Sequence, residues 1–393
     1  MKKYNFDEHV ERQNTGCAKY DSREAVFGKT DVIPLWVADM DFRVADVIVE
    51  EIQKQIDHGI LGYPAAQPSV YKAIISWLKH HHDWDVKASW ITFCPGVVPG
   101  LGAAVQAYTK PGDKVVVQPP VYHPFFYAIT NNDRVIVENR LVEKEEGYYV
   151  MDYADLEEKL KDASLFILCN PHNPVGRSWT KEELTKLGEL CIKHNVVIIS
   201  DEIHADLNMP SHKHTPTASI STEISDITLT FMAPSKTFNT AGLSQAFGVS
   251  TNPEILNKYN KQSNRLFLGN SLLGLAALRA AFEKGDEWLS QLIPYISENA
   301  DYVISFLKKE VPLLKARKQE ATYLLWLDCR GLGLNQEELT SFMVNDAGIG
   351  MNNGEMFGEN GKGFMRMNLA CPRATLEKAM HQLKAAVDSK FDK

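Results

Sequence analysis

Two charged residues of the chain follow apolar runs in settings that favour chemistry. Lys236 comes after the run Ile227–Met232 in a turn of small residues, where desolvation lowers the pKa of an amine and lets it attack a carbonyl group. Asp201 comes after the run Val196–Ser200, and a carboxylate in that position is unfavourable to bury unless a cation meets it. Taken singly, a Ser-Lys pair is nonspecific and Asp201 fits a helix N-cap, so neither residue alone predicts a site.

Three further turns carry complementary groups. Asn173 belongs to a turn with two Asn-Pro steps, and its amide could donate to a phenolate oxygen. Tyr122 follows two prolines that fix a rigid turn, so its ring could stack on a flat molecule. Gly96 opens a glycine-rich turn into an Ala-rich helix, whose N-terminus suits a phosphate, although each of these turns also fits a purely structural role. The apolar runs before them are Trp90–Phe93, Lys114–Val117 and Leu165–Cys169.

The elements that must position these groups alternate along the chain. Short β-branched runs are separated by helical stretches such as Thr180–His194, which Thr180 and Glu183 open as a capping box. This alternation predicts an α/β fold with a mostly parallel sheet between helices. Because ligands bind outside the carboxyl ends of the strands in such a sheet, we expect all five turns in one crevice. A phosphate cradle, an aromatic ring, an amide, a carboxylate and an amine together match a phosphorylated pyridine aldehyde.

The pattern changes from about Pro294 onward and predicts a second, smaller α+β domain. The N-terminal stretch has little periodic structure before Pro34–Val37, and we expect it to pack on that smaller domain. The predicted division is therefore a large domain of residues 46–290 and a small domain of residues 1–45 and 291–393. The expected elements of the small domain are Tyr295–Lys309 and Thr375–Phe391 as helices, with Thr322–Leu327 and Phe364–Leu369 as strands.

Composition narrows the class of protein. The chain has 393 residues, of which 44% are hydrophobic and 23% are charged, as in an ordinary globular protein. The formal net charge of −8 argues against a nucleic-acid or anionic-membrane partner, because phosphate binding needs clustered Lys and Arg. The charged start lacks a stretch that resembles a signal peptide, and no run approaches a membrane span, so we expect a cytoplasmic protein.

Two residue sets that suggest metal or disulfide chemistry have simpler explanations. The six scattered cysteines form no Cys-x-x-Cys pair and are expected to be buried, reduced thiols. His80, His81 and His82 splay around a helix, and no Cys or carboxylate set completes a site, so we expect an exposed helical surface and no metal.

The order of the chemical groups resembles a known superfamily. Asn173 in Asn-Pro-Val-Gly, then Asp201, then Ser235-Lys236, then Arg366 near the C-terminus is similar to the fold-type I pyridoxal-5′-phosphate (PLP) enzymes of the aspartate-aminotransferase superfamily. The resemblance implies that Lys236 holds PLP as a Schiff base, that Asp201 pairs with the pyridine nitrogen and that Asn173 bonds the phenolic oxygen. It also implies that Arg366 holds the substrate α-carboxylate; the alternative for Arg366 is a bridge between the two domains.

Further motifs resemble one branch, the MalY/PatB-type C–S lyases, which are the cystathionine β-lyase-like group. This resemblance implies that Tyr122 stacks on the cofactor ring and that Tyr63 reaches the phosphate of a neighbouring subunit, which predicts a homodimer with shared active sites. It places the amides of Gly96, Val97 and Val98 at the phosphate, His204 and Ser235 in the cofactor site, and Ala38 with Asn173 and Arg366 at the substrate. The motifs are Val37–Phe42, Gly62–Pro64, Gly96–Val98, Pro120–Tyr122, Ser200–Asp206, Ser235–Asn239 and Ala321–Asp328.

Two departures weaken a plain aminotransferase assignment. Many aminotransferases have a phosphate-binding arginine eight residues after the lysine, where this chain has Ser244, and a tyrosine three residues after the aspartate, where it has His204. The predicted function is therefore PLP-dependent β-elimination on cystathionine-type amino acids, with a class I/II aminotransferase as the alternative and a regulatory protein of the same fold as a more distant one. Lys236 would take the Cα proton, and Lys236, Tyr122 or Tyr63 would protonate the leaving thiolate, while Asp201 sustains the cofactor.

Overall fold

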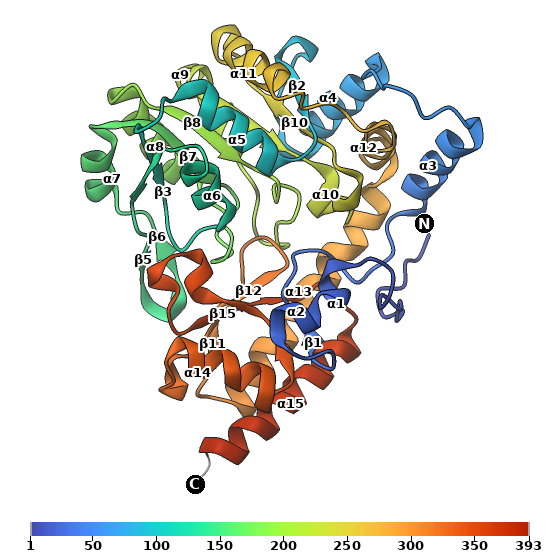
Figure 1. The fold of residues 1–393 in the computed structure, drawn as a ribbon, viewed down its shortest axis with the longest axis vertical. Helices are drawn as coiled ribbons and strands as arrows, with labels where there is room; N and C mark the ends of the chain where they lie inside the picture. The colour runs from blue at the N-terminus through green and yellow to red at the C-terminus, as the bar shows by residue number, and fades with distance from the viewer. Residues whose placement is uncertain (1, 392–393) are drawn as a thin grey trace.

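The computed structural model describes residues 2–391, and its largest element is a seven-stranded sheet in the upper body of Figure 1. Strand β10 is antiparallel to both of its neighbours, β2 and β9, and the remaining pairs are parallel, so all strands except β10 point the same way. The strands in spatial order are β2 (Ile91–Cys94), β10 (Ala246–Val249), β9 (Thr228–Met232), β8 (Val197–Asp201), β7 (Ala163–Cys169), β3 (Lys114–Val117) and β4 (Val135–Glu138). The carboxyl ends of the five predicted strands therefore share one edge of the sheet, as the sequence predicted.

The sheet is buried on both faces because neighbouring residues of its strands alternate between two cores. Val115 and Ile167 pack with Leu101 of helix α5 (Val97–Tyr108) in one core. Val116 and Phe166 belong instead to the core of helices α7 (Tyr153–Leu160) and α8 (Lys181–Lys193). This period of two on continuous apolar strands is typical of a sheet between two helical layers.

The capping box predicted for α8 is confirmed. The Thr180 hydroxyl accepts from the Glu183 amide at 3.2 Å, and the Glu183 carboxylate accepts from the Thr180 amide at 2.9 Å. The other helices of this body are α3 (Asp46–His58), α4 (Pro68–His82), α6 (Pro124–Thr130), α9 (Thr222–Asp226), α10 (Pro234–Thr237), α11 (Pro253–Arg265) and α12 (Leu272–Lys284).

The lower body of Figure 1 is built on a four-stranded antiparallel sheet with helices beside it. Two N-terminal residues, Ile33 and Leu35, share the core of this body with Leu325. Its elements are α1 (Ala18–Asp21), α2 (Arg23–Phe27), β1 (Ile33–Pro34), α13 (Asp286–Glu310), β11 (Lys315–Ala316), β12 (Leu324–Asp328), α14 (Gln336–Ser341), β13 (Ile349–Gly350), β14 (Asn352–Asn353), β15 (Phe364–Asn368) and α15 (Arg373–Phe391). Strand β1 pairs with β13, so the two ends of the chain meet in this body.

The start of α13 was predicted wrongly. The sequence predicted an amphipathic helix over Tyr295–Lys309, after a change of pattern at about Pro294. In the structure the helix begins at Asp286 and continues through Pro294. The predicted domain division between residues 290 and 291 falls inside this helix and stays a prediction.

The three adjacent histidines are not a uniformly exposed surface, and that prediction is wrong for His82. His82 is 6% exposed, because Val70, Ile74 and Leu78 of α4 define a buried face that the four-residue spacing continues to His82. Its Nε2 lies 2.8 Å from Asp206 Oδ1. Only His80 of the three is exposed, and His81, half-buried, stacks on Trp77.

A carboxylate does approach the histidines. Asp286 lies 2.6 Å from His81 Nε2, and possible ligand atoms of His80, His81 and Asp286 lie within 4.8 Å of one another. The sequence could not show this approach, since Asp286 belongs to α13. All six cysteines are free. No helix among residues 2–391 is long and apolar enough to cross a membrane.

Candidate active site

Lys236 lies at the end of the central strands, in the short helix α10 that Pro234 begins directly after β9. Its Nζ donates to the Ala38 carbonyl oxygen at 2.6 Å. Burial lowers the pKa of Lys236 to about 8, and the positive charge of Arg366 contributes to that shift. A substantial fraction of this amine is therefore neutral near pH 8 and able to act as a nucleophile or base.

Asp201 is the last residue of β8 and lies between β7 and β9, opposite Cys169 on one side and Phe231 on the other. Its Oδ1 accepts from the Ile203 amide at 3.1 Å. Burial raises the pKa of Asp201 to about 7, and this backbone hydrogen bond opposes the shift. A buried carboxylate of this kind gains stability from a cationic partner, as the sequence reasoning anticipated.

Arg366 on β15 is a buried cation held by neutral groups. Its Nη1 donates to Asn173 Oδ1 at 3.0 Å, and its Nη2 donates to the Trp36 carbonyl oxygen at 3.0 Å and to Asn352 Oδ1 at 2.6 Å. Nε has no hydrogen-bond partner, and the guanidinium forms no ion pair with any described carboxylate. Burial lowers the pKa of Arg366 to about 10. The site therefore has an unpaired positive charge that an incoming carboxylate would neutralise.

The contact with Arg366 also orients Asn173. Since a guanidinium can only donate, the amide oxygen of Asn173 faces Arg366. The NH₂ group of Asn173 is thereby turned away from Arg366 and available to donate elsewhere, which is what the sequence reasoning required of it.

Aromatic side chains complete the crevice. Tyr122 is half-buried, and burial followed by the negative charge of Asp201 raises its pKa to about 12, so it keeps its proton at neutral pH. His204 is buried with its ring 6.0 Å from that of Tyr323, edge to face. Burial lowers the pKa of His204 well below its usual range, so the ring is neutral. The Tyr323 hydroxyl donates to the Ala38 carbonyl oxygen at 2.9 Å, beside Lys236.

The predicted phosphate cradle is the start of α5. Gly96 is the N-cap of this helix and provides no side-chain cap, so the first amides of the helix, including those of Val97 and Val98, remain available to an anion. Ser235 lies in the first turn of α10. Tyr63 is fully exposed in the connection between α3 and α4.

A segment of the N-terminal region forms one wall of the site, and sequence reasoning did not identify what holds it. The Asn239 side chain makes two hydrogen bonds to the Met40 backbone: its Oδ1 accepts from the Met40 amide at 2.9 Å, and its Nδ2 donates to the Met40 carbonyl oxygen at 2.9 Å. Asn368 donates to the Val37 and Asp39 carbonyl oxygens at 2.7 and 2.6 Å. These contacts fix the Ala38 carbonyl that receives Lys236. Arg12 and the buried Lys19 add ion pairs to Asp41 at 2.5 and 3.1 Å.

A buried polar cluster supports Lys236 from behind. Asp206 accepts hydrogen bonds from Trp77 Nε1 at 3.0 Å and from Thr237 Oγ1 at 2.7 Å, and it contacts His82. Thr237 directly follows Lys236, so the cluster anchors the turn that carries the amine. The motif around Asp201 includes Asp206, but its partner Trp77 lies 129 residues earlier in the chain, and sequence spacing gave no sign of the contact.

The crevice fits pyridoxal phosphate. A buried carboxylate with a raised pKa, Asp201, suits a protonated pyridine nitrogen, and the neutral fraction of Lys236 suits an aldehyde. The uncapped α5 N-terminus suits a phosphate, and Tyr122 supplies an aromatic face. The fold is that of the fold-type I PLP-dependent transferases.

Comparison with known proteins establishes the family. The model of the family described as aminotransferase class I and II matches residues 30–383. The chain belongs to this family.

The relatives include C–S lyases. The chain is 46% identical to cystathionine beta-lyase PatB of Bacillus subtilis over 386 residues, which is 98% of this chain and 100% of that protein. It is 31% identical to the protein MalY of Escherichia coli, with 98% of this chain and 99% of MalY covered. The crystal structure of cystalysin from Treponema denticola, which contains pyridoxal 5′-phosphate, superposes with a TM-score of 0.96 at 37% identity and covers 99% of this chain and 100% of that one.

Proposed function

We propose that the protein is a PLP-dependent carbon–sulfur β-lyase acting on cystathionine-type amino acids. The reaction converts cystathionine and water into homocysteine, pyruvate and ammonia. The pairing in one crevice of Lys236, whose pKa is lowered, with the buried and unpaired guanidinium of Arg366 supports PLP chemistry on an amino acid. The observation that carries the choice of β-elimination is the 46% identity to a cystathionine beta-lyase over nearly the whole chain.

Arg366 binds the substrate α-carboxylate in this proposal. Its neighbours Asn173 and Asn352 hold the guanidinium with neutral hydrogen bonds, so it meets the substrate with its full charge. The Ala38 carbonyl lies beside Lys236 and limits where the rest of the amino acid can lie. The substrate is thereby oriented with its Cα near the lysine.

Lys236 holds the cofactor and then acts as the base that removes the Cα proton. Bound PLP supplies an electron sink for bond breaking at Cα, and Asp201 keeps the pyridine nitrogen protonated by pairing with it. The free amine of Lys236 has a pKa of about 8, close to the range that favours proton transfer at neutral pH, so it would serve as this base.

A proton must reach the leaving sulfur. Tyr122 is one candidate donor: burial raises its pKa to about 12, so the hydroxyl carries a proton at neutral pH but is a weak acid. Lys236 can also return the proton that it took from Cα. Loss of the thiol leaves an enamine that is hydrolysed to pyruvate and ammonia.

The decisive experiment supplies purified holoenzyme with L-cystathionine and no keto acid. We expect pyruvate and homocysteine to form in equal amounts and at a constant rate. An aminotransferase, the alternative within the family, would stop after about one turnover per site and resume only when 2-oxoglutarate is added. That second result would overturn the lyase proposal.

We further propose that the enzyme is a homodimer in which Tyr63 of one subunit reaches the phosphate in the other. Tyr63 is fully exposed beside Ile60 and Leu61, which are 70% and 64% exposed, and such apolar patches mark association surfaces. Location in the cytoplasm remains a prediction.

Mixed dimers test the shared site. We expect dimers that combine a Lys236→Ala subunit with a Tyr63→Phe subunit to contain one complete site, whose activity matches that of a wild-type site. If the activity per intact lysine stays at the level of the Tyr63→Phe enzyme, Tyr63 acts within its own subunit or not at all. A monomer in light-scattering measurements would also contradict the proposal.

A further inference from the structure

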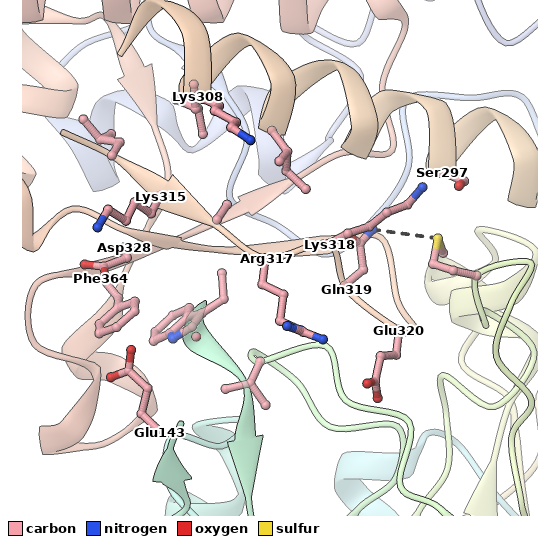
Figure 2. Close-up of a pocket in the computed structure, with 18 of the residues that line it drawn as sticks. Glu143, Ser297, Lys308, Lys315, Arg317, Lys318, Gln319, Glu320, Asp328 and Phe364 are labelled. Atoms are coloured by element: carbon pink, nitrogen blue, oxygen red, sulfur yellow. Dashed lines mark hydrogen bonds between the residues drawn. The ribbon is translucent and has the colours of Figure 1, made fainter. Parts of the chain in front are cut away.

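A second cavity of about 1050 Å³ lies along the segment of residues 315–320 that follows α13. Figure 2 shows Arg317 projecting from this segment into the space between Glu143 and Glu320. The described lining contains none of the residues assigned above to the cofactor or the substrate. The lining of the cavity is therefore distinct from that of the crevice, although Trp326 pairs with Arg366 across β12 and β15.

The cavity has unpaired positive charges. Among the described residues, Lys308, Lys315 and Arg317 form no ion pair, whereas the carboxylates of the lining all have cationic partners. Those partners are Arg330 for Glu143 and Asp328, both at 2.7 Å, and Arg177 for Glu320 at 2.8 Å. An anion is consequently the ligand that the charge of the cavity favours.

Arg317 is held in place by an aromatic ring. Its guanidinium lies 4.7 Å from the centre of the Tyr148 ring, and the guanidinium of Arg177 lies 4.2 Å from the same ring. Stacking restricts the side chain but neutralises no charge. Arg317 is thus positioned to bind a carboxylate through two parallel hydrogen bonds.

The other residues of the lining favour a ligand that has an apolar body and a hydrogen-bond donor. Trp326 and Phe364 are stacked with their ring centres 5.0 Å apart, and both line the cavity. Gln319 is only 3% exposed, and its Oε1 accepts no hydrogen bond, while its Nε2 makes only long contacts to Met209 Sδ and the Thr322 carbonyl oxygen. A buried amide oxygen without a partner gains stability from a donated N–H.

The same segment is joined to the catalytic turn. The amides of Glu320 and Ala321 donate to the Gly176 carbonyl oxygen at 2.8 and 3.1 Å. Gly176 has a φ of 73°, and a Cβ there would lie 2.5 Å from Gln319 Cβ, so the two segments pack in direct contact. Asn173, three residues before Gly176, holds Arg366. The segment that carries Gln319 therefore contacts the turn whose Asn173 orients the guanidinium of Arg366.

We propose that this cavity binds a small organic carboxylate with an apolar body and one N–H donor, the class of amino acids and their N-acyl derivatives. The carboxylate binds Arg317, the N–H reaches Gln319 Oε1, and the apolar body lies near Trp326 and Phe364. Occupancy changes the affinity of the catalytic site for its substrate through the Gly176 turn.

N-acetyl-L-phenylalanine is a suitable probe, because its acylated nitrogen cannot attach to the cofactor. Titration calorimetry on the holoenzyme is expected to show saturable binding, and the binding should shift the KM for cystathionine. Arg317→Gln should weaken the binding at least about tenfold, on the scale of a hydrogen bond to a charged group, and abolish the KM shift. Lys309→Gln is the matched control, since Lys309 adjoins Lys308 but pairs with Glu310 at 2.9 Å outside the lining.

The proposal would be overturned by no binding at millimolar probe, by equal binding to wild type and Arg317→Gln, or by loss of binding in Arg366→Gln with retention in Arg317→Gln. The last result would place the probe in the catalytic crevice. N-acetyl-L-phenylalaninamide, which lacks the carboxylate, should bind at least tenfold more weakly, and equal binding would also contradict the proposal. Calorimetry reads binding directly, so these outcomes do not depend on whether the enzyme is a lyase.

Discussion

The crevice has two walls, one supplied by the seven-stranded sheet and the other by the four-stranded sheet. The two walls hold their functional side chains differently. Asp201 ends β8 and Lys236 follows β9. Among the described residues the side chain of each makes one hydrogen bond, from Lys236 to the Ala38 carbonyl oxygen and from the Ile203 amide to Asp201. Arg366 on the other wall is held by three partners from three separate segments. The first wall keeps reactive atoms available for chemistry, while the second fixes a binding group in one orientation.

This difference predicts that substitutions on the first wall abolish chemistry, whereas those on the second weaken substrate binding. The largest effect should come from Lys236→Ala. We expect a loss of at least about 10³-fold in kcat, because both the attachment point and the base are removed. Steady-state assays with cystathionine measure the loss, and Lys258→Ala, an exposed lysine on α11, is the control. Near-normal turnover by Lys236→Ala would contradict the claim that the first wall supplies the chemistry.

Arg366→Lys should have the next largest effect. A lysine keeps the charge but cannot form the two parallel bonds to a carboxylate or reach all three partners of Arg366. We expect kcat/KM to fall about 10²–10³-fold, as for loss of a buried charged hydrogen bond, with most of the change in KM. Arg43→Lys, at an exposed arginine, should be neutral. A fall in kcat alone would show that Arg366 serves chemistry rather than binding.

The pH dependence of PLP attachment tests Lys236 on the first wall alone. Only the neutral amine of Lys236 attacks the PLP aldehyde, and its pKa is lowered to about 8. The rate at which the apoenzyme attaches PLP should therefore rise about tenfold per pH unit below pH 8 and level off above it. Stopped-flow absorbance measures this rate. A rise that continues toward the ordinary lysine pKa would show that burial does not tune the amine.

Asn352→Ala should produce the smallest effect and sharpen the contrast. Its Oδ1 accepts from Arg366 Nη2 at 2.6 Å, but Trp36 and Asn173 still hold the guanidinium in the variant. We expect KM to rise about tenfold with kcat nearly unchanged, on the scale of one hydrogen bond to a charged group. A matched Asn353→Ala variant on the same strand should leave KM unchanged, and equal effects would remove Asn352 from the binding site.

The contrast also explains what could be predicted from the sequence. Local patterns in the sequence predicted three features correctly: the α/β fold, the order of the polar groups after the strands and the capping box of Thr180. Strand β10 was missed because Ala246 and Gly248, which have low strand propensity, make up half of its run, and the contact of His82 with Asp206, 124 residues away, could not be predicted from sequence spacing. The hydrogen bonds of Asn352 and Trp36 to Arg366 were not predicted for the same reason. Hydrogen bonds between distant segments leave no periodic trace in a sequence.

The most direct test asks which amine holds the cofactor. Borohydride reduction of the PLP-loaded protein makes the attachment permanent, and mass spectrometry of its peptides then locates the label. We predict one label per chain, on Lys236. A label on any other lysine, or an unlabelled Lys236 in active protein, would contradict the assignment of the crevice as the active site.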